Sequence, residues 1–500
     1  MTATIAAADA RSAFERDVAR WWRPTLLIVA IIVGTAARVF YNRAMPLWFD
    51  ETFTGIIAGQ ATLGGLWHWL RTELTGPGYY APMWLWARFA GVSTEALRFP
   101  SLACTLLAPL IVWRRGHPDA TMRLAWAAVL LLWMPAGVLA SDARPYALLF
   151  LLGTLQIAAF CALMREPTRA AALRWVLPTL AIGLTHYIAL LPGLVQGLML
   201  LAVHRRSAVR LWPAAAPLLV LIGWMAIHLP FVVRIQSVGI PMTTTLTPYV
   251  ILQLPALIAG DGLFAGMLAA LLVWSGSMRV REVSLRRWRP SAEAWTVLAA
   301  IASFAALFGI GLIVPGMALR YFLPTLPGLL FALAWWLTGA LKRGEAAAAA
   351  FLLTMVVGCA GVAVSGWRDT SLDQRHAFGI DLASRWLAER KVGRLLFFWS
   401  DTTAELAPDL DRNLAELGGF FLHRDGQPVP VDVLHVPQEA NAVAAVVARA
   451  DARGDNALLW VGNARGDNPL RQPDALIRDP RWDCRDFGAG LAMSLACRRR

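Results

Sequence analysis

Residues 21–51 read WWRPTLLIVAIIVGTAARVFYNRAMPLWFDE. The run Trp21–Tyr41 is apolar, is long enough to cross a bilayer and lacks a convincing small-residue cleavage site. We interpret it as a retained first transmembrane helix and not as a signal peptide. Two adjacent carboxylates, Asp50 and Glu51, follow a few residues later, on the side of the membrane that this helix would reach.

The composition extends the membrane interpretation to the whole chain. Hydrophobic residues make up 57% of it and charged residues 16%, whereas soluble domains carry about 25% charged residues. The net charge of +13 comes from Lys and Arg clusters between apolar runs, as cytoplasmic loops require. No basic stripe with interleaved aromatics stands out as a nucleic-acid site. No glycine-rich loop precedes a lysine, which argues against nucleotide hydrolysis.

Apolar runs of spanning length recur along the chain and predict an all-α polytopic bundle of about eleven transmembrane helices. The basic loops alternate consistently with short loops that are poor in Lys and Arg, which places the N-terminus in the cytoplasm and the C-terminus in the periplasm of a bacterial inner membrane. The predicted spans are 24–41, 97–113, 124–140, 145–163, 174–187, 188–203, 211–231, 250–276, 294–315, 321–341 and 346–365.

Two segments do not fit a plain bundle. The outer loop 42–96 contains an apolar stretch, Tyr79–Ala87, that is too short to span and is expected to lie in the membrane interface. After the transmembrane domain, 1–365, the polar tail 366–500 alternates helical patterns with short β-type runs and predicts a small periplasmic α/β domain. Its Cys484 and Cys497 would lie in an oxidising compartment, so we predict a disulfide between them. The helical patterns are Ile380–Lys391 and Gln438–Ala450, and the β-type runs are Arg394–Trp399, Val431–Val436 and Ala457–Val461.

Short polar motifs recur at the outer ends of the predicted spans. The first, Leu47-Trp48-Phe49-Asp50-Glu51, offers carboxylates that can act as a general base or hold a cation, although a solvated loop pair would look the same. The others are Gly78-Tyr79-Tyr80-Ala81-Pro82, Ala96-Leu97-Arg98-Phe99-Pro100-Ser101, Asp142-Ala143-Arg144-Pro145-Tyr146-Ala147-Leu148, Thr185-His186-Tyr187 and Arg320-Tyr321-Phe322-Leu323-Pro324.

In this order, the motifs resemble those of the GT-C glycosyltransferases. The most similar branch holds protein O-mannosyltransferases, lipid A aminoarabinose transferases and rhizobial lipopolysaccharide galacturonosyltransferases, and the resemblance covers about residues 20–340. It implies a polyprenyl-phosphate sugar donor and an inverting transfer outside the cytoplasm to a glycan, lipid or protein. The family's acidic residue of the first outer loop corresponds to Asp50, with Glu51 beside it, and its second acidic site to Asp142. Many relatives have a His-Pro-Pro string where this chain has Gly78–Pro82. The contact that those relatives make through the string therefore differs in this chain.

The residue chemistry is compatible with such a transfer. A lipid phosphate is already a good leaving group, so the reaction needs a base for the acceptor hydroxyl and positive charge on the departing phosphate. Asp50 can be the base, and the forked guanidinium groups of Arg144 and Arg320 can bind phosphate oxygens. Tyr80, His186 and Tyr321 are candidates for the substrate pocket. Asp50, Glu51 and Asp142 could also supply oxygen ligands to a divalent metal, whose requirement the sequence leaves open.

Each candidate has a plainer interpretation. Asp142 and Arg144 could cap helix ends around Pro145, Arg320 could reach to the interface from a helix end, and His186 could be a packing histidine. A transporter or flippase of lipid-linked sugars is the alternative function, but transporters usually carry ionisable residues at mid-membrane, and here polar residues gather at the outer ends. A non-catalytic sensor or scaffold with the same fold is a third possibility.

Overall fold

The computed structural model describes a chain that forms two compact units. The bundle unit comprises 1–43, 101–225 and 241–369, and the mixed unit comprises 44–100, 226–240 and 370–500. Most of the predicted outer loop therefore belongs to the same unit as the tail. The residues described are 24–41, 45–238, 253–254, 256, 258–260, 262–279, 290–314, 319–368, 379–399, 410–436, 441–454, 456–462, 473–488 and 493–500.

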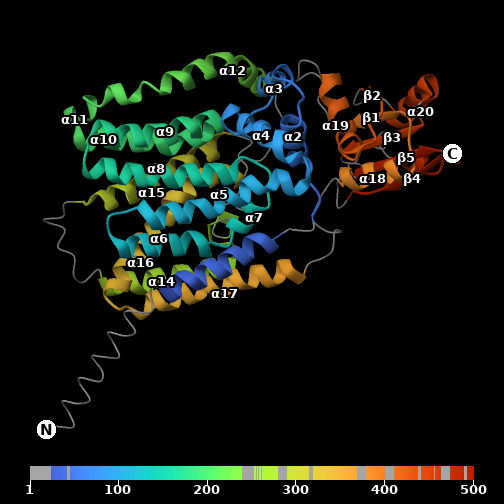
Figure 1. Cartoon of the computed structure of the whole chain (residues 1–500). Helices are drawn as coiled ribbons and strands as arrows, with labels where there is room; N and C mark the ends of the chain where they lie inside the picture. The colour runs from blue at the N-terminus through green and yellow to red at the C-terminus, as the bar shows by residue number, and fades with distance from the viewer. Residues whose placement is uncertain are drawn as a thin grey trace, which may run out of the picture. The chain divides into compact units, whose positions relative to one another are not determined.

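The bundle unit is a set of packed helices (Figure 1). Among the described residues, six helices are long and apolar enough to cross a membrane, and three shorter apolar helices, Pro24–Phe40, Ala120–Leu132 and Leu218–Arg234, accompany them. The chain is thus a multi-pass membrane protein. Its labelled helices are α5 (Thr94–Arg115), α6 (Ala120–Leu132), α7 (Ala136–Ala140), α8 (Tyr146–Arg165), α9 (Arg169–Thr185), η1 (Tyr187–Leu190), α10 (Leu191–His204), α11 (Arg206–Val209), η2 (Trp212–Ala215), α12 (Leu218–Val238), α14 (Gly262–Arg279), α15 (Ala292–Ile313), η5 (Leu319–Thr325), α16 (Leu326–Lys342) and α17 (Ala346–Arg368).

Two helix breaks decide where polar groups can lie. The chain is extended at His186, between α9 and η1, so the predicted spans 174–187 and 188–203 form separate helices. The single span predicted over 124–140 is wrong, because α6 ends at Leu132 and α7 begins at Ala136. Trp133 takes extended backbone angles and Pro135 has no amide hydrogen, so the hydrogen-bond ladder of α6 stops here.

A buried arginine donates hydrogen bonds to the last carbonyl groups of α6. Arg38 is only 2% exposed and donates to the carbonyl oxygens of Leu130 and Leu131 at 2.8 and 2.7 Å. These carbonyls lie in the last helical turn, which lacks its own donors and attracts positive charge. Gly34 permits the close approach, because a Cβ atom there would lie 2.3 Å from the oxygen of Leu131. The charge within the first helix therefore has a structural role.

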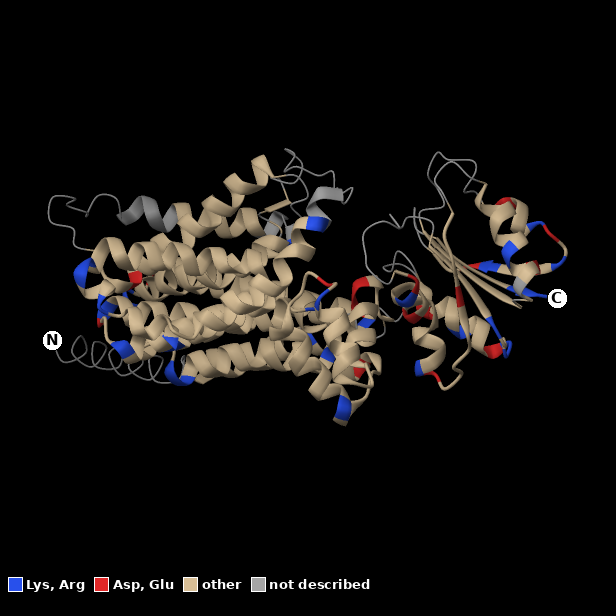
Figure 2. Cartoon of the chain, turned by 90° about the horizontal axis from the view of Figure 1, so that it is seen from above, with Lys and Arg blue, Asp and Glu red and all other residues tan. Residues whose placement is uncertain are grey.

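Charged side chains are unevenly distributed over the bundle unit. Figure 2 shows Lys and Arg gathered where the helices end, with uncharged residues along their middles. Several helices end in basic residues, as the alternation of basic loops leads one to expect: Arg114 and Arg115 on α5, Arg165 on α8 and Lys342 on α16. The predicted basic residues of 281–289 lie outside the described residues.

The mixed unit combines outer-loop helices with an α/β fold. Its helices are α2 (Phe49–Ala58), α3 (Leu63–Leu70), α4 (Pro77–Ala90), α18 (Ile380–Glu389), α19 (Leu410–Arg424), α20 (Ala442–Arg453) and α21 (Asp474–Ile477). The strands are β1 (Leu395–Trp399), β2 (Val431–Leu434), β3 (Ala457–Gly462), β4 (Trp482–Asp486) and β5 (Met493–Arg499), in the sheet order β2-β1-β3-β5-β4. The predicted α/β tail is confirmed.

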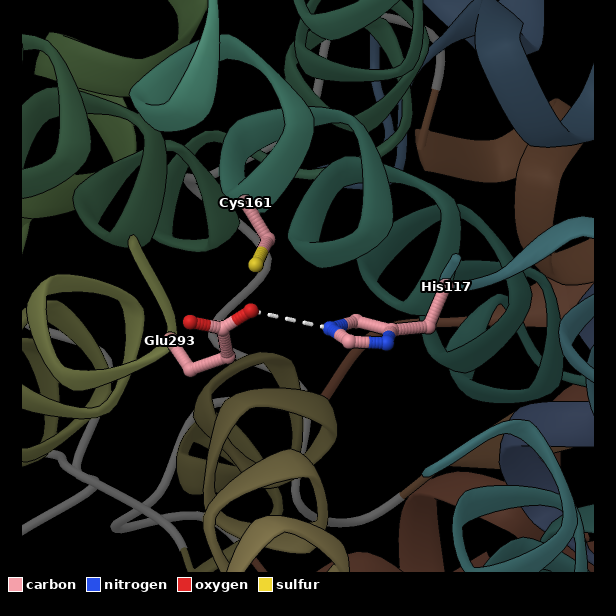
Figure 3. Close-up of side chains that lie close together, drawn as sticks. All are labelled: His117, Cys161 and Glu293. Atoms are coloured by element: carbon pink, nitrogen blue, oxygen red, sulfur yellow. Dashed lines mark hydrogen bonds and ion pairs between the residues drawn. The ribbon is translucent and has the colours of Figure 1, made fainter. Parts of the chain in front are cut away.

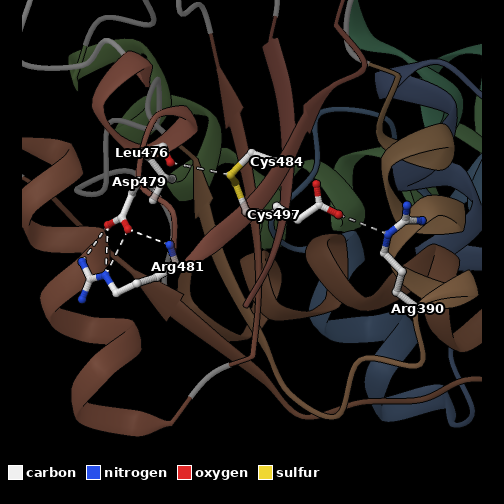
Figure 4. Close-up of a disulfide and its surroundings, with 7 residues drawn as sticks. Arg390, Leu476, Asp479, Arg481, Cys484 and Cys497 are labelled. Atoms are coloured by element: carbon white, nitrogen blue, oxygen red, sulfur yellow. Dashed lines mark hydrogen bonds and ion pairs between the residues drawn. A yellow bond between two sulfur atoms is a disulfide. The ribbon is translucent and has the colours of Figure 1, made fainter. Parts of the chain in front are cut away.

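The strand direction in the sheet reverses between β3 and β5. β1 pairs in parallel with β2 and β3, whereas β5 runs antiparallel to β3 and to β4. Cys484 on β4 and Cys497 on β5 are directly opposite partners, and a disulfide joins them (Figure 4). The structure thus contains the bond that the sequence predicts.

Candidate functional site

The two adjacent carboxylates of the first motif have different surroundings. Glu51 lies in the first turn of α2, is fully buried, and is held by Arg98. The guanidinium donates from Nε to Oε1 at 2.7 Å and from Nη2 to Oε2 at 2.5 Å, and the backbone N–H of Trp48 also donates to Oε2 at 3.0 Å. Both oxygens of Glu51 are therefore used within the protein, and Arg98 is a residue to which sequence reasoning assigned no role.

Arg98 also fixes the loop that precedes α2. Its Nη1 and Nη2 donate to the carbonyl oxygens of Met45 and Pro46 at 2.8 and 3.0 Å. One side chain thus secures both the start of α2 and the segment leading into it. Asp50, between Phe49 and Glu51 in the same turn, is only partly buried. This difference in exposure separates a candidate reactive carboxylate from a structural one.

Tyr80 lies in α4, where its side chain is fully buried and its ring centroid lies 5.2 Å from that of Tyr79. Its assignment to a substrate pocket stays a prediction. A cavity of about 670 Å³ does adjoin α2 within the mixed unit. Its walls come from α2, α4, α19 and β2, and its charged lining residues are Arg88, Arg412, Glu416 and Arg424.

Helix α19 holds α2 and α3 from the side of the tail. Glu416 accepts hydrogen bonds from Gln60 Nε2 and from Trp69 Nε1, both at 2.7 Å. His68 Nε2 lies 2.8 Å from Asn413 Oδ1. The helix carrying Asp50 is therefore secured by Arg98 at its start and through Gln60, just past its end, by α19.

The second acidic motif lies between α7 and α8 in the bundle unit. Arg144 is 9% exposed, and Pro145 follows it as the residue that precedes α8. Ser101 donates its hydroxyl to the backbone carbonyl of Asp142 at 2.7 Å, which fixes the course of this connection. The side chain of Asp142 is partly buried.

Four of the predicted residues come together in the bundle unit. The ring centroids of His186 and Tyr321 are 5.7 Å apart, and the Arg320 guanidinium carbon lies 5.9 Å from the Tyr321 ring centroid. Arg144 and Arg320 are both near enough for their positive charges to act on His186. The break at His186, the loop before α8 and the start of η5 therefore concentrate two guanidinium groups around an imidazole. Asp50, Glu51 and Tyr80 belong to the mixed unit.

Glu51, one of the predicted metal ligands, is poorly placed to bind a metal ion, because Arg98 already binds both of its oxygens. Among the described residues, the group whose potential ligand atoms converge is His117, Cys161 and Glu293 (Figure 3). Arg165 is bonded to this group, with Nη2 at 2.6 Å from Glu293 Oε1 and 3.3 Å from Cys161 Sγ. A guanidinium there disfavours a second cation, so we regard the group as an ion-pair cluster.

No protein-family model matches the sequence, and no curated protein matches it by sequence. Solved structures do match the fold. ArnT from Cupriavidus metallidurans matches in the apo state with a TM-score of 0.56 at 16% identity, over 96% of this chain and 98% of that chain. The same protein bound to undecaprenyl phosphate gives 0.55 at 16% identity, over 95% and 98%. The oligosaccharyltransferase AglB from Archaeoglobus fulgidus, in complex with an inhibitory peptide and a dolichol-phosphate, gives 0.52 at 12%, over 89% and 70%.

ArnT and AglB are both members of the GT-C superfamily. The chain therefore has the expected fold over nearly its whole length, while the count of about eleven transmembrane helices stays a prediction.

Proposed function

We propose that this protein is a membrane glycosyltransferase that moves a sugar from a polyprenyl-phosphate donor to an acceptor hydroxyl on the extracytoplasmic face. The observation that carries the proposal is the concentration of Arg144 and Arg320 around His186 in a largely apolar helical unit. Forked guanidinium groups bind phosphate oxygens well. The likeness in fold to structures that hold undecaprenyl phosphate or a dolichol-phosphate supports a lipid phosphate as their ligand.

The chemistry requires little beyond a base and a phosphate site. As the acceptor oxygen attacks the anomeric carbon, the bond to the phosphate oxygen breaks and negative charge grows on the lipid phosphate. Arg144 and Arg320 would stabilise that charge in a medium of low dielectric constant, where electrostatic effects are strong. Asp50 would take the proton of the acceptor hydroxyl. A single displacement from the face opposite the phosphate inverts the anomeric centre.

We assign Glu51 a positioning role in this reaction. Because Arg98 binds both of its oxygens, Glu51 is poorly suited to accept a proton or to bind a metal ion. Its contacts instead fix the first turn of α2, which carries Asp50. For the acceptor, we propose the cavity beside α2, whose volume of about 670 Å³ is ample for a sugar or a small headgroup.

The test uses the full-length protein in nanodiscs with a polyprenyl-phosphate sugar, with release of polyprenyl phosphate as the readout. Asp50→Asn should lower turnover by about 10²–10⁴-fold with donor binding retained. Arg144→Ala and Arg320→Ala should weaken donor binding, and the Lys replacements should restore only part of it, because an ammonium cannot form the forked contact.

Matched controls are Asp474→Asn on α21 and Arg210→Ala after α11, both on exposed residues. Their turnover should equal that of the wild type. Wild-type donor use by both Arg144→Ala and Arg320→Ala would refute the phosphate site, and wild-type turnover by Asp50→Asn would refute the base.

The buried charge of Arg38 gives the flippase alternative no support, because its hydrogen bonds go to helix-end carbonyls.

A further inference from the structure

A second cavity lies in the bundle unit, away from the groups assigned to the reaction. It has a volume of about 400 Å³ and lies where α6 and α15 begin and α16 ends. Helix ends of this kind mark the boundary between the bilayer and water. The lining residues are His117, Asp119, Met122, Glu293, Trp335, Trp336, Thr338, Gly339, Lys342 and Arg343.

The carboxylates of this cavity are already neutralised. Glu293 Oε1 receives Arg165 Nη2 at 2.6 Å and lies 3.0 Å from His117 Nε2. Asp119 accepts from Thr121 N at the start of α6 and forms an ion pair with Lys342. The lysine can release that carboxylate at little cost, since both partners are partly exposed.

The charged groups that line the cavity are two cations, Lys342 and Arg343, and two carboxylates, Asp119 and Glu293. Lys342 pairs with Asp119, Arg343 with Glu345, and Glu293 with Arg165 beside the lining. Arg123 adds a further positive charge next to His117. Arg123 donates to the carbonyl oxygens of His117 and Pro118 and so uses no carboxylate in these bonds. The side chains of Lys342 and Arg343 are 54% and 50% exposed and can therefore reach a ligand.

The rest of the lining is mostly apolar and lies on α6 and α16. Trp335 is 39% exposed, and tryptophan is enriched where membrane helices meet water. Gly339 leaves space for the neighbouring cation, since a Cβ atom there would lie 3.2 Å from Arg343 Nη2. The cavity thus combines two exposed cations at a helix end with an indole surface, which suits a headgroup with its acyl chains alongside.

We propose that this cavity binds the headgroup of an anionic phospholipid, with Lys342 and Arg343 contacting the phosphodiester and Trp335 contacting the upper acyl chain. Basic pockets between helices on the cytoplasmic side are known to take such headgroups. The site is independent of the sugar transfer, because none of its residues belongs to the groups assigned to donor or acceptor. Cytoplasmic placement follows from the basic loops at these helix ends.

The test is native mass spectrometry of the full-length protein in detergent, titrated with dioleoyl phosphatidylglycerol or dioleoyl phosphatidylcholine. The wild type should retain the anionic lipid in preference to the zwitterionic one. The double variant Lys342→Gln/Arg343→Gln should bind phosphatidylglycerol about thirtyfold more weakly, since each cation near a lipid surface contributes about a factor of five to six. Gly339→Leu, which fills the cavity without altering charge, should weaken binding as well.

The matched control is Arg205→Gln/Arg206→Gln, which removes two exposed cations from the loop after α10. This loop is at the same end of the bundle, because His204 Nε2 lies 3.2 Å from the carbonyl oxygen of Met164 near the end of α8. The control should retain binding. Equal losses in both double variants would indicate general surface charge and overturn the proposal. Unchanged binding by Lys342→Gln/Arg343→Gln, or displacement of the lipid by millimolar inorganic phosphate, would also overturn it.

Discussion

At the scale of single residues, the pair of Glu51 and Arg98 separates positioning from catalysis. Because Glu51 is fully buried and Arg98 is 11% exposed, removing one partner leaves an uncompensated buried charge. We expect Arg98→Ala to destabilise the protein by about 3–5 kcal/mol, whereas Glu51→Leu/Arg98→Met should recover much of that loss. Thermal unfolding in detergent measures both. A double variant that melts as low as Arg98→Ala would contradict this account of the pair.

The buried carboxyl group of Asp381 should make the stability of the fold depend on pH. It lies in the first turn of α18 and is 4% exposed, and burial raises the pKa of its carboxyl group against the opposing charges of Arg385 and Arg424. A raised folded-state pKa means that the folded form binds the proton more tightly. The stability from this group is therefore fully present below the unfolded pKa and is lost as pH rises through the folded pKa.

Asp381→Asn should consequently flatten the rise in melting temperature that accompanies mild acidification. The measurement is thermal unfolding at several pH values between 4 and 7, with the exposed Asp474→Asn as the control. An unaltered pH profile in Asp381→Asn would show that burial of this carboxyl group costs nothing at neutral pH.

At the residue scale, the sequence indicates the identity of reactive groups better than their partners. Asp50 and Glu51 are equivalent in the sequence, and only the fold distinguishes them, because Arg98 lies 47 positions away from Glu51. Arg98 is the one cation in Ala96–Ser101, and this is the signal that could have identified it. The role of Arg38 could not be predicted for the same reason, since its partners on α6 are more than 90 positions away.

At the scale of elements, the disulfide joins two strands that are hard to detect. β4 reads WDCRD and β5 reads MSLACRR, so neither has a clean alternation of apolar and polar residues. The bond closes a short loop, with the cysteines 13 positions apart. Loop closure of this size stabilises a fold by about 3 kcal/mol through the unfolded state.

We therefore expect Cys484→Ser/Cys497→Ser to lower the unfolding free energy of the tail by about 3 kcal/mol. Limited proteolysis of the tail, followed with and without reductant, measures the effect. Reductant should sensitise the wild type and leave the double variant unchanged. A wild-type tail that resists proteolysis equally in both conditions would contradict a stabilising role.

The elements that the sequence predicted are those with strong local patterns. α18, α20 and β1 to β3 lie close to their predicted ranges. The apolar periodicity of α18 is clear, and β1 and β3 are continuous apolar runs. α19 was not predicted, and Gly418 and Gly419 in its interior disfavour a helix locally. Gly418 is required by packing, since a Cβ atom there would lie 2.5 Å from the Phe397 ring. Tertiary contacts with β1 thus override the local preference.

At the scale of the whole molecule, charge distribution predicts which side of the membrane each end faces. The basic residues gather at helix ends of the bundle unit, and a predicted odd number of spans puts the C-terminus on the opposite side from the N-terminus. The Cys484–Cys497 bond agrees with this orientation, because disulfides persist in oxidising compartments. The transfer proposed for Asp50 also depends on this orientation, since that carboxylate would reach an acceptor of the cell envelope only if the mixed unit is periplasmic.

Alkaline phosphatase folds only outside the cytoplasm, so fusions of it report the orientation directly. We expect a fusion after Arg500 to be active and a fusion after Arg206, at the start of α11, to be inactive. A green fluorescent protein at the same two positions should give the reverse pattern, which controls for expression. An inactive phosphatase and a fluorescent partner at Arg500 would place the tail in the cytoplasm. The base and phosphate residues would then face the wrong compartment for an envelope acceptor, and the lipid cavity would belong to the outer leaflet.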